Sequence, residues 1–167
     1  MCGIGAILNN YNKNPKNKKF LEYISHRGRD GLNFEENEKF FFGHSLFKST
    51  DKNLNSNFQP LKSIITNNTL IFNGDIYNYK ELRSVYLSNY KFVSNSDTEV
   101  LLYMYDKFGT EFLKYLVGDF SLIIHDYHKK QYLIARDRFG VKPLFYLKNK
   151  DQFFFSSEIK AIKSFLS

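Results

Sequence analysis

The first eight residues, MCGIGAIL (residues 1–8), decide how this chain is expected to fold. Cys2 is its only cysteine, and the residues from Cys2 to Leu8 alternate around small glycines, a pattern typical of a β-strand that starts at the first usable residue. If Met1 is removed, Cys2 carries both a thiol and a free α-amine, so one residue supplies nucleophile and general base. The α-amine, with a pKa of about 8, and the thiol, with a pKa of about 8.5, both have reactive fractions near neutrality. The stretch predicts a strand that presents a nucleophile able to attack an amide; the alternative is an unpaired small residue after the start codon.

Size and composition are typical of one globular domain. At 167 residues the chain is long enough for one core and too short for two ordinary domains. Its 18 Phe and 12 Tyr are expected to supply much of that core. Apolar stretches do not reach the ~18 residues of a membrane helix, and the first residues lack the pattern of a secretory signal. A single thiol cannot cross-link the fold, which favours a reducing, cytoplasmic location.

The net charge of +7 raises the alternative of a nucleic-acid-binding protein. The basic residues of segment 13–19 are interleaved with Asn and Pro, and the others are scattered among acids, without an aromatic-interleaved basic stripe. This placement argues against nucleic acid as a partner. The oligomeric state is left open, with a homodimer as one alternative.

Periodicity predicts an α+β domain with antiparallel sheets. The expected strands are 2–8, 39–47, 61–66, 69–73, 120–125, 131–135, 144–147 and 153–155, with a hairpin turn at Asn67-Asn68. The expected helices are 15–25, 79–87, 96–107 and 157–165. Ser96 and Glu99 form a predicted capping box at the start of the third helix. Residues 9–14, 28–31 and 48–58 are expected to form loops or turns.

Asn73-Gly74 is a second candidate for chemistry. An amide hydrolase needs hydrogen-bond donors for the oxyanion of its tetrahedral intermediate, and this pair offers a side-chain amide beside an unhindered backbone N–H. The pair follows a predicted strand and precedes a predicted helix, a common place for a site. The alternative is that Asn-Gly forms only a turn.

Several motifs in order resemble the class II glutamine amidotransferase domain, an N-terminal-nucleophile hydrolase, and specifically the glutaminase half of glutamine-dependent asparagine synthetase. They are Cys2-Gly3-Ile4, His26-Arg27-Gly28, Gly43-His44, Gln59-Pro60-Leu61, residues 73–82, residues 96–100, Gly118-Asp119-Phe120, residues 136–144 and residues 155–161. The resemblance implies a four-layer αββα sandwich of antiparallel sheets, with Cys2 at the end of an inner strand.

The resemblance also implies roles for individual residues. Cys2 would attack the side-chain amide of L-glutamine and form a thioester, releasing ammonia and then glutamate. The Asn73 side chain and the Gly74 N–H would hold the oxyanion. Asp97 would bind the α-ammonium of glutamine, although an acid in the first turn of a helix is also favoured by the helix dipole alone. Asp75 replaces the glutamate usual in the family and is one methylene shorter.

The main departure from the family pattern is Leu46, which stands where the family has the arginine that binds the glutamine carboxylate. Leucine cannot pair with an anion, so glutamine binding is expected to weaken by one to two powers of ten. Lys48 lies two residues further on, and a regular strand would place it on the same face. Lys48 is therefore a hypothesis for the replacement carboxylate anchor, with a solvated loop lysine as the equal alternative. Leu46 also supports a rival function, a degenerate glutaminase fold acting as a non-catalytic interaction module or ammonia-channelling partner.

The family's synthetase domain starts with a Ser-Gly-Gly-x-Asp-Ser loop that holds ATP pyrophosphate, and this string does not occur in residues 1–167. No cofactor is therefore expected on this chain, and ATP and Mg²⁺ are expected only on a separate synthetase domain or subunit. Residues 136–144 and the final helix are expected to provide its docking surface. The histidines lack metal-ligand spacing, so no metal site is expected.

Overall fold

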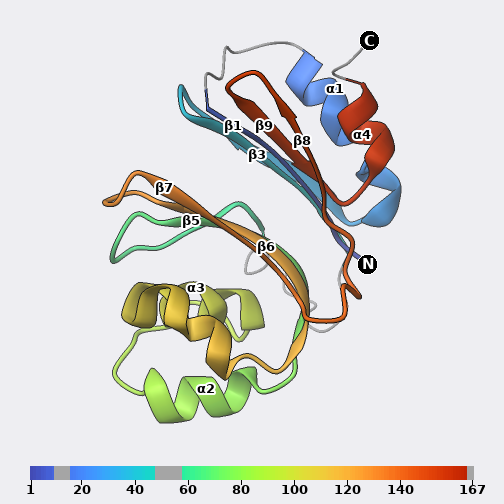
Figure 1. Ribbon diagram of the computed structural model, residues 1–167. Helices are drawn as coiled ribbons and strands as arrows, with labels where there is room; N and C mark the ends of the chain where they lie inside the picture. The colour runs from blue at the N-terminus through green and yellow to red at the C-terminus, as the bar shows by residue number, and fades with distance from the viewer. Residues whose placement is uncertain (10–15, 48–57, 165–167) are drawn as a thin grey trace.

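The computed structural model describes residues 1–9, 16–47 and 58–164. These residues form two antiparallel sheets, one of five strands and one of four, which face each other and carry helices on their outer sides (Figure 1). The fold is the predicted α+β sandwich with αββα layers.

The five-stranded sheet is built around the N-terminal strand. Its order is β2 (Gly31–Glu36), β3 (Phe40–Leu46), β1 (Gly3–Leu8), β9 (Gln152–Ser156) and β8 (Phe145–Asn149). Two short helices, α1 (Lys16–Glu22) and α4 (Ile159–Lys163), cover its outer face, and a 3-10 turn (Ser25–Arg27) follows α1 (Figure 1). Phe20 and Phe41 pack edge to face in the core between the helices and the sheet. Since β1 is the central strand, the residue before it has a fixed position at the end of the sandwich.

The four-stranded sheet carries the longer helices. Its order is β4 (Leu61–Lys62), β5 (Thr69–Ile76), β6 (Gly118–Asp126) and β7 (Gln131–Arg136). The covering helices are α2 (Tyr79–Tyr86) and α3 (Asp97–Phe108), and a 3-10 segment (Gly109–Tyr115) continues from α3. The Ser96 hydroxyl accepts a hydrogen bond from the Glu99 N–H at 3.4 Å, which is one half of the predicted capping box. In place of the other half, the Glu99 carboxylate accepts from the N–H groups of Val93 and Ser94 at 2.9 and 2.8 Å, and the Ser96 N–H donates to the Ser94 hydroxyl at 3.3 Å.

A cluster of buried side chains fills the space between the two sheets. It includes Ile4 from β1, Phe42 from β3, Ile71 from β5 and Ile123 from β6, all buried. Because successive side chains of a strand point to opposite faces, residues two positions apart share a face. Asn73 and Asp75 therefore lie on the same inner face as Ile71.

The observed strands differ from the predicted ones by three residues or more in three places. The edge strand β2 is not predicted from the sequence, because most of its side chains are exposed and it has no buried alternation. Residues 63–66 form a turn rather than a strand, since the Ser63 hydroxyl accepts hydrogen bonds from the backbone N–H groups of Ile65 and Thr66 at 3.2 and 3.3 Å. The chain reverses between Lys62 and Thr69, so the turn is longer than the predicted Asn67-Asn68 pair. β5 extends to Ile76, three residues beyond the predicted end.

The predicted terminal helices are shorter in the structure. The helix expected over 15–25 is helical over Lys16–Glu22 and then becomes the 3-10 turn, and the one expected over 157–165 starts at Ile159. The loop predictions for residues 10–14 and 48–57 lie outside the described residues.

Candidate active site

Cys2 lies directly before β1, at the end of the sandwich where the chain crosses from β7 to β8 (Figure 1). Its Sγ atom accepts a hydrogen bond from the Phe47 N–H at 3.3 Å and lies 3.5 Å from the Phe47 carbonyl oxygen. The Arg27 Nε donates to the Cys2 carbonyl at 3.0 Å, and the same guanidinium pairs with Glu158 at 2.8 Å. These contacts hold the backbone and the thiol of Cys2 in one place.

Arg27 is a positioning residue that the sequence reasoning does not identify. It lies in the motif His26-Arg27-Gly28, which the sequence analysis uses only as a family marker. Its side chain is 12% exposed and reaches from the 3-10 turn to Cys2 and to Glu158 at the start of α4. The sequence does not indicate that Arg27 contacts Cys2, because 25 residues separate the two.

Asn73 has an unusual environment for a buried amide. It is 1% exposed, and neither its Nδ2 nor its Oδ1 has a hydrogen-bond partner among the described residues. Buried polar groups in native proteins are nearly always paired, so an unpaired one is a candidate ligand-binding group.

Gly74 is required by strand packing as well as by any role of its N–H. A Cβ on this residue would lie 2.3 Å from the Asp119 carbonyl oxygen, since Gly74 faces Phe120 on the neighbouring strand β6. The sequence predicts a glycine here for its unhindered backbone N–H. In the structure, strand β6 also approaches this residue closely.

Two carboxylates complete the candidate site. Asp97, the first residue of α3, accepts a hydrogen bond from the Ile76 N–H at 3.0 Å. Burial raises the pKa of Asp97 above its usual range, the Ile76 hydrogen bond opposes this change, and the nearby charge of Asp75 adds to it. Asp75 forms an ion pair with Lys142, whose Nζ lies 3.1 Å from Asp75 Oδ2. Lys142 belongs to segment 136–144, a family motif and expected docking surface for which no role in the site is predicted.

The electrostatics of Cys2 show that these groups converge. Burial is the main cause that raises the pKa of the Cys2 thiol above its usual value, and the charges of Asp75 and Asp97 raise it further. The Phe47 backbone hydrogen bond and the N-terminal charge oppose the increase. Cys2, Asp75 and Asp97 therefore lie close enough for their charges to interact, although they are far apart in the chain.

Leu46 is 4% exposed at the end of β3. By strand alternation it shares the inner face with Phe42. Lys48, the hypothetical replacement anchor, lies outside the described residues.

Two of the four histidines, His26 and His44, have clearly different surroundings. His26 Nε2 lies 3.2 Å from Glu158 on the surface, while His44 is 1% exposed and burial lowers its pKa to about 3. Within residues 1–9, 16–47 and 58–164, no group of three or more His, Cys, Asp or Glu side chains could hold a metal ion. In the same ranges no helix combines the length and apolar character needed to cross a bilayer.

Comparisons with known proteins agree with this architecture. Asparagine synthetase (glutamine-hydrolyzing) 2 of Bacillus subtilis is 35% identical over 170 residues, covering 98% of this chain and 22% of that protein. Asparagine synthetase B (glutamine-hydrolyzing) of Escherichia coli is 36% identical over 149 residues, covering 87% of this chain and 26% of that protein. The glutamine phosphoribosylpyrophosphate amidotransferase of Bacillus subtilis superposes with a TM-score of 0.80 at 21% identity, over 98% of this chain and 43% of that one.

The chain thus spans about a quarter of the length of these two synthetases. The family model described as a glutamine amidotransferase domain matches residues 1–166, nearly the whole chain. The chain therefore belongs to the glutamine amidotransferase domain family.

Proposed function

We propose that this domain hydrolyses L-glutamine to glutamate and ammonia through a Cys2 thioester. After removal of Met1, the thiol sulfur attacks the side-chain amide carbon of glutamine while the α-amine of Cys2 takes the thiol proton. The C–N bond then breaks, and ammonia leaves with that proton. Water attacks the thioester, which releases glutamate and restores the thiol.

The unpaired amide of Asn73 is the observation that carries this proposal. A buried donor without a partner in the described part of the chain costs stability, so its presence needs a functional reason. In the proposal, Asn73 Nδ2 and the Gly74 N–H donate to the oxyanion of the tetrahedral intermediate. Such donors act in the transition state because they are in place before the charge develops.

The carboxylates of Asp97 and Asp75 are suited to bind the α-ammonium group of glutamine. Asp97 and Asp75 are close enough to Cys2 to affect its pKa, and they carry the charge that an α-ammonium group requires. Asp97 is largely buried and held by the Ile76 N–H, so it is a fixed acceptor. Lys48 stays a prediction as the partner of the α-carboxylate.

The ammonia is proposed to serve amide formation, with aspartate as the acceptor and asparagine as the product. Both synthetases described above are named for glutamine-dependent asparagine synthesis. A synthetase domain or subunit, with ATP and Mg²⁺, is part of this proposal, as is a cytoplasmic location that keeps Cys2 reduced. Exposed Phe139 and Val141, at 92% and 52%, support a docking surface on the connection from β7 to β8.

One observation favours a second candidate function, a non-catalytic interaction module that keeps the fold. Leu46 removes the expected carboxylate partner, as a degenerate site would.

A glutaminase assay separates the two functions. Mass spectrometry first establishes that Met1 is absent, and glutamate formation is then followed across millimolar glutamine. The enzyme proposal predicts glutamate release that is lost in Cys2→Ala. A Met1-free sample that forms no glutamate would leave the interaction module as the function.

A further inference from the structure

We infer that Lys142 binds the α-carboxylate of the substrate in place of the arginine that Leu46 has replaced. This inference rests on the proposed glutaminase function and concerns how the same site recognises glutamine. It follows from the position of Lys142, its fixed backbone and the charge pattern around it.

Lys142 is directed into the candidate site. Its side chain is 14% exposed, and its Nζ lies 3.1 Å from Asp75 Oδ2. Asp75 is on the inner face of β5, two residues after Asn73, which corresponds to a rise of about 6.6 Å along the strand. The amide carbon and the carboxylate carbon of an extended glutamine are separated by four C–C bonds, about 5 Å. A glutamine with its amide at Asn73 therefore places its charged head near Asp75 and the Lys142 ammonium.

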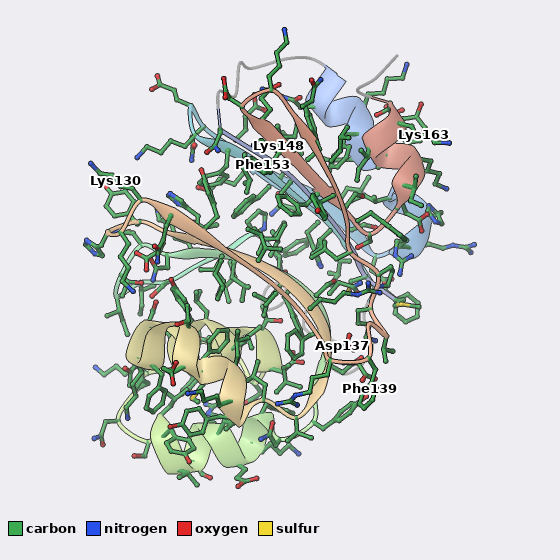
Figure 2. All side chains as sticks on the ribbon, in the orientation of Figure 1. Lys130, Asp137, Phe139, Lys148, Phe153 and Lys163 are labelled. Carbon is green, nitrogen blue, oxygen red and sulfur yellow. The ribbon has the colours of Figure 1, made fainter. Side chains whose placement is uncertain are left out.

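The backbone of Lys142 is held in place before any ligand binds. The Asp137 carboxylate accepts hydrogen bonds from the N–H groups of Phe139, Val141 and Lys142 at 3.1, 2.9 and 3.1 Å. Burial alone would raise the pKa of Asp137, but these backbone hydrogen bonds lower it, so the carboxylate stays ionised and the loop stays closed around it. Figure 2 shows Asp137 and Phe139 on this connection between β7 and β8.

Arg136 also holds the loop of residues 137–142 in place, through the carbonyl groups of the loop. Its Nε donates to the Lys142 carbonyl at 2.7 Å, and its second guanidinium nitrogen donates to the Gly140 carbonyl. Gly140 has φ +65°, a left-handed conformation that favours glycine. A lysine on a loop with this many fixed contacts loses little backbone freedom when it binds an anion.

The charges also fit a zwitterion. Asp97 and Asp75 supply two negative charges for the α-ammonium group, and Lys142 supplies a positive charge beside them for the α-carboxylate. A carboxylate has about four lone-pair sites, so Asp75 can contact the ammonium while it stays paired with Lys142. Lys142 can therefore bind the α-carboxylate without giving up its ion pair with Asp75.

The test compares glutamine with 4-aminobutanamide, which is glutamine without its α-carboxylate. The proteins are Met1-free wild type, Lys142→Met and Lys142→Arg, with Lys148→Met as a control for loss of one lysine. Lys148 is exposed on β8, away from Asp137 and Phe139 (Figure 2). We expect Lys142→Met to lower kcat/KM for glutamine about 10-fold or more and to change kcat/KM for 4-aminobutanamide less than about 2-fold. Lys142→Arg is expected to retain most activity, and Lys148→Met all of it.

Equal losses with both substrates, or no loss with glutamine, would overturn the inference. A carboxylate-selective loss in Lys48→Met but not in Lys142→Met would overturn it in favour of Lys48. The same two ligands are also titrated by NMR into Cys2→Ala and Cys2→Ala/Lys142→Met. This binding experiment tests Lys142 without catalysis, so an inactive wild type rejects the proposed function while the ligand selectivity still decides the role of Lys142.

Discussion

Replacing Asn73 by leucine is expected to stabilise the protein and to remove its activity. The side chain is buried between the two sheets, and neither of its polar atoms is paired with another described residue. Leucine has the same branching pattern without polar atoms, so Asn73→Leu removes a desolvation cost and also removes the proposed oxyanion donor. Opposite changes in stability and activity distinguish a functional amide from a structural one.

The size of both changes follows from the environment of Asn73. An unsatisfied buried donor or acceptor costs about 1–3 kcal/mol, so we expect Asn73→Leu to increase the free energy of unfolding by about that amount. In a domain of this size, 1 kcal/mol shifts Tm by roughly 2–4 °C, which gives a rise of about 2–12 °C. Loss of one oxyanion donor lowers kcat by about 10²–10³.

Thermal unfolding by circular dichroism and a coupled assay for glutamate measure the two effects. Ser121→Ala is the matched control, because Ser121 lies opposite Asn73 on β6 and its Oγ is also unpaired within the described residues. Because the unpaired Ser121 hydroxyl carries the same kind of desolvation cost, we expect Ser121→Ala also to raise Tm, by roughly 2–4 °C for each kcal/mol removed, while kcat stays within about 2-fold of wild type. If Asn73→Leu lowers Tm, or keeps kcat within about 3-fold of wild type, the argument that the amide is kept for catalysis is refuted.

Three further predictions test the site and its surroundings. Gly74→Ala is expected to destabilise the domain by about 1–3 kcal/mol in urea unfolding, because its Cβ would lie 2.3 Å from the Asp119 carbonyl oxygen; an unchanged midpoint would contradict this. Alkylation of Cys2 by iodoacetamide in Met1-retaining protein should reach half its maximal rate above the pH of an ordinary thiol, about 8.5, since burial and two carboxylates raise the pKa of Cys2. His44 has a pKa of about 3 when folded and about 6.5 when unfolded, so between these values the unfolded state binds more protons and stability should fall on acidification, on the order of 1 kcal/mol per pH unit. His44→Leu should remove most of that slope in urea titrations at pH 6.5, 5.5 and 4.5, and an unchanged slope would show that His44 is not its source.

Local sequence signals predict most of the fold because they coincide with buried packing. The strand that starts at Gly3 and the helix capped by Ser96 both combine a strong pattern with a core-facing side. The edge strand β2 lacks that signal, since one sheet neighbour and exposed side chains hold it in place. Ser63 shows the opposite case, in which an apolar-polar pattern that predicts a strand is overridden by side-chain to backbone hydrogen bonds.

The candidate site is less predictable, because its parts come from distant segments. Cys2, Asn73 and Asp97 are found from motifs, but the contacts that position them are not local. Arg27 reaches Cys2 across 25 residues, and Lys142 reaches Asp75 across 67. The spacing of residues along the sequence does not reveal contacts between residues this far apart.

The charges around Cys2 also explain why removal of Met1 matters for the proposed reaction. Burial, Asp75 and Asp97 all disfavour the thiolate, so the resting site holds a protonated thiol rather than a ready nucleophile. A base must therefore take the proton as the sulfur attacks. His44 is a poor base at neutral pH, because burial lowers its pKa to about 3. While Met1 is attached, the Cys2 nitrogen belongs to a peptide bond and cannot accept a proton. Cleavage after Met1 converts that nitrogen into an amine beside the thiol, and the carboxylates that oppose the thiolate then favour the ammonium that forms when the amine takes the proton.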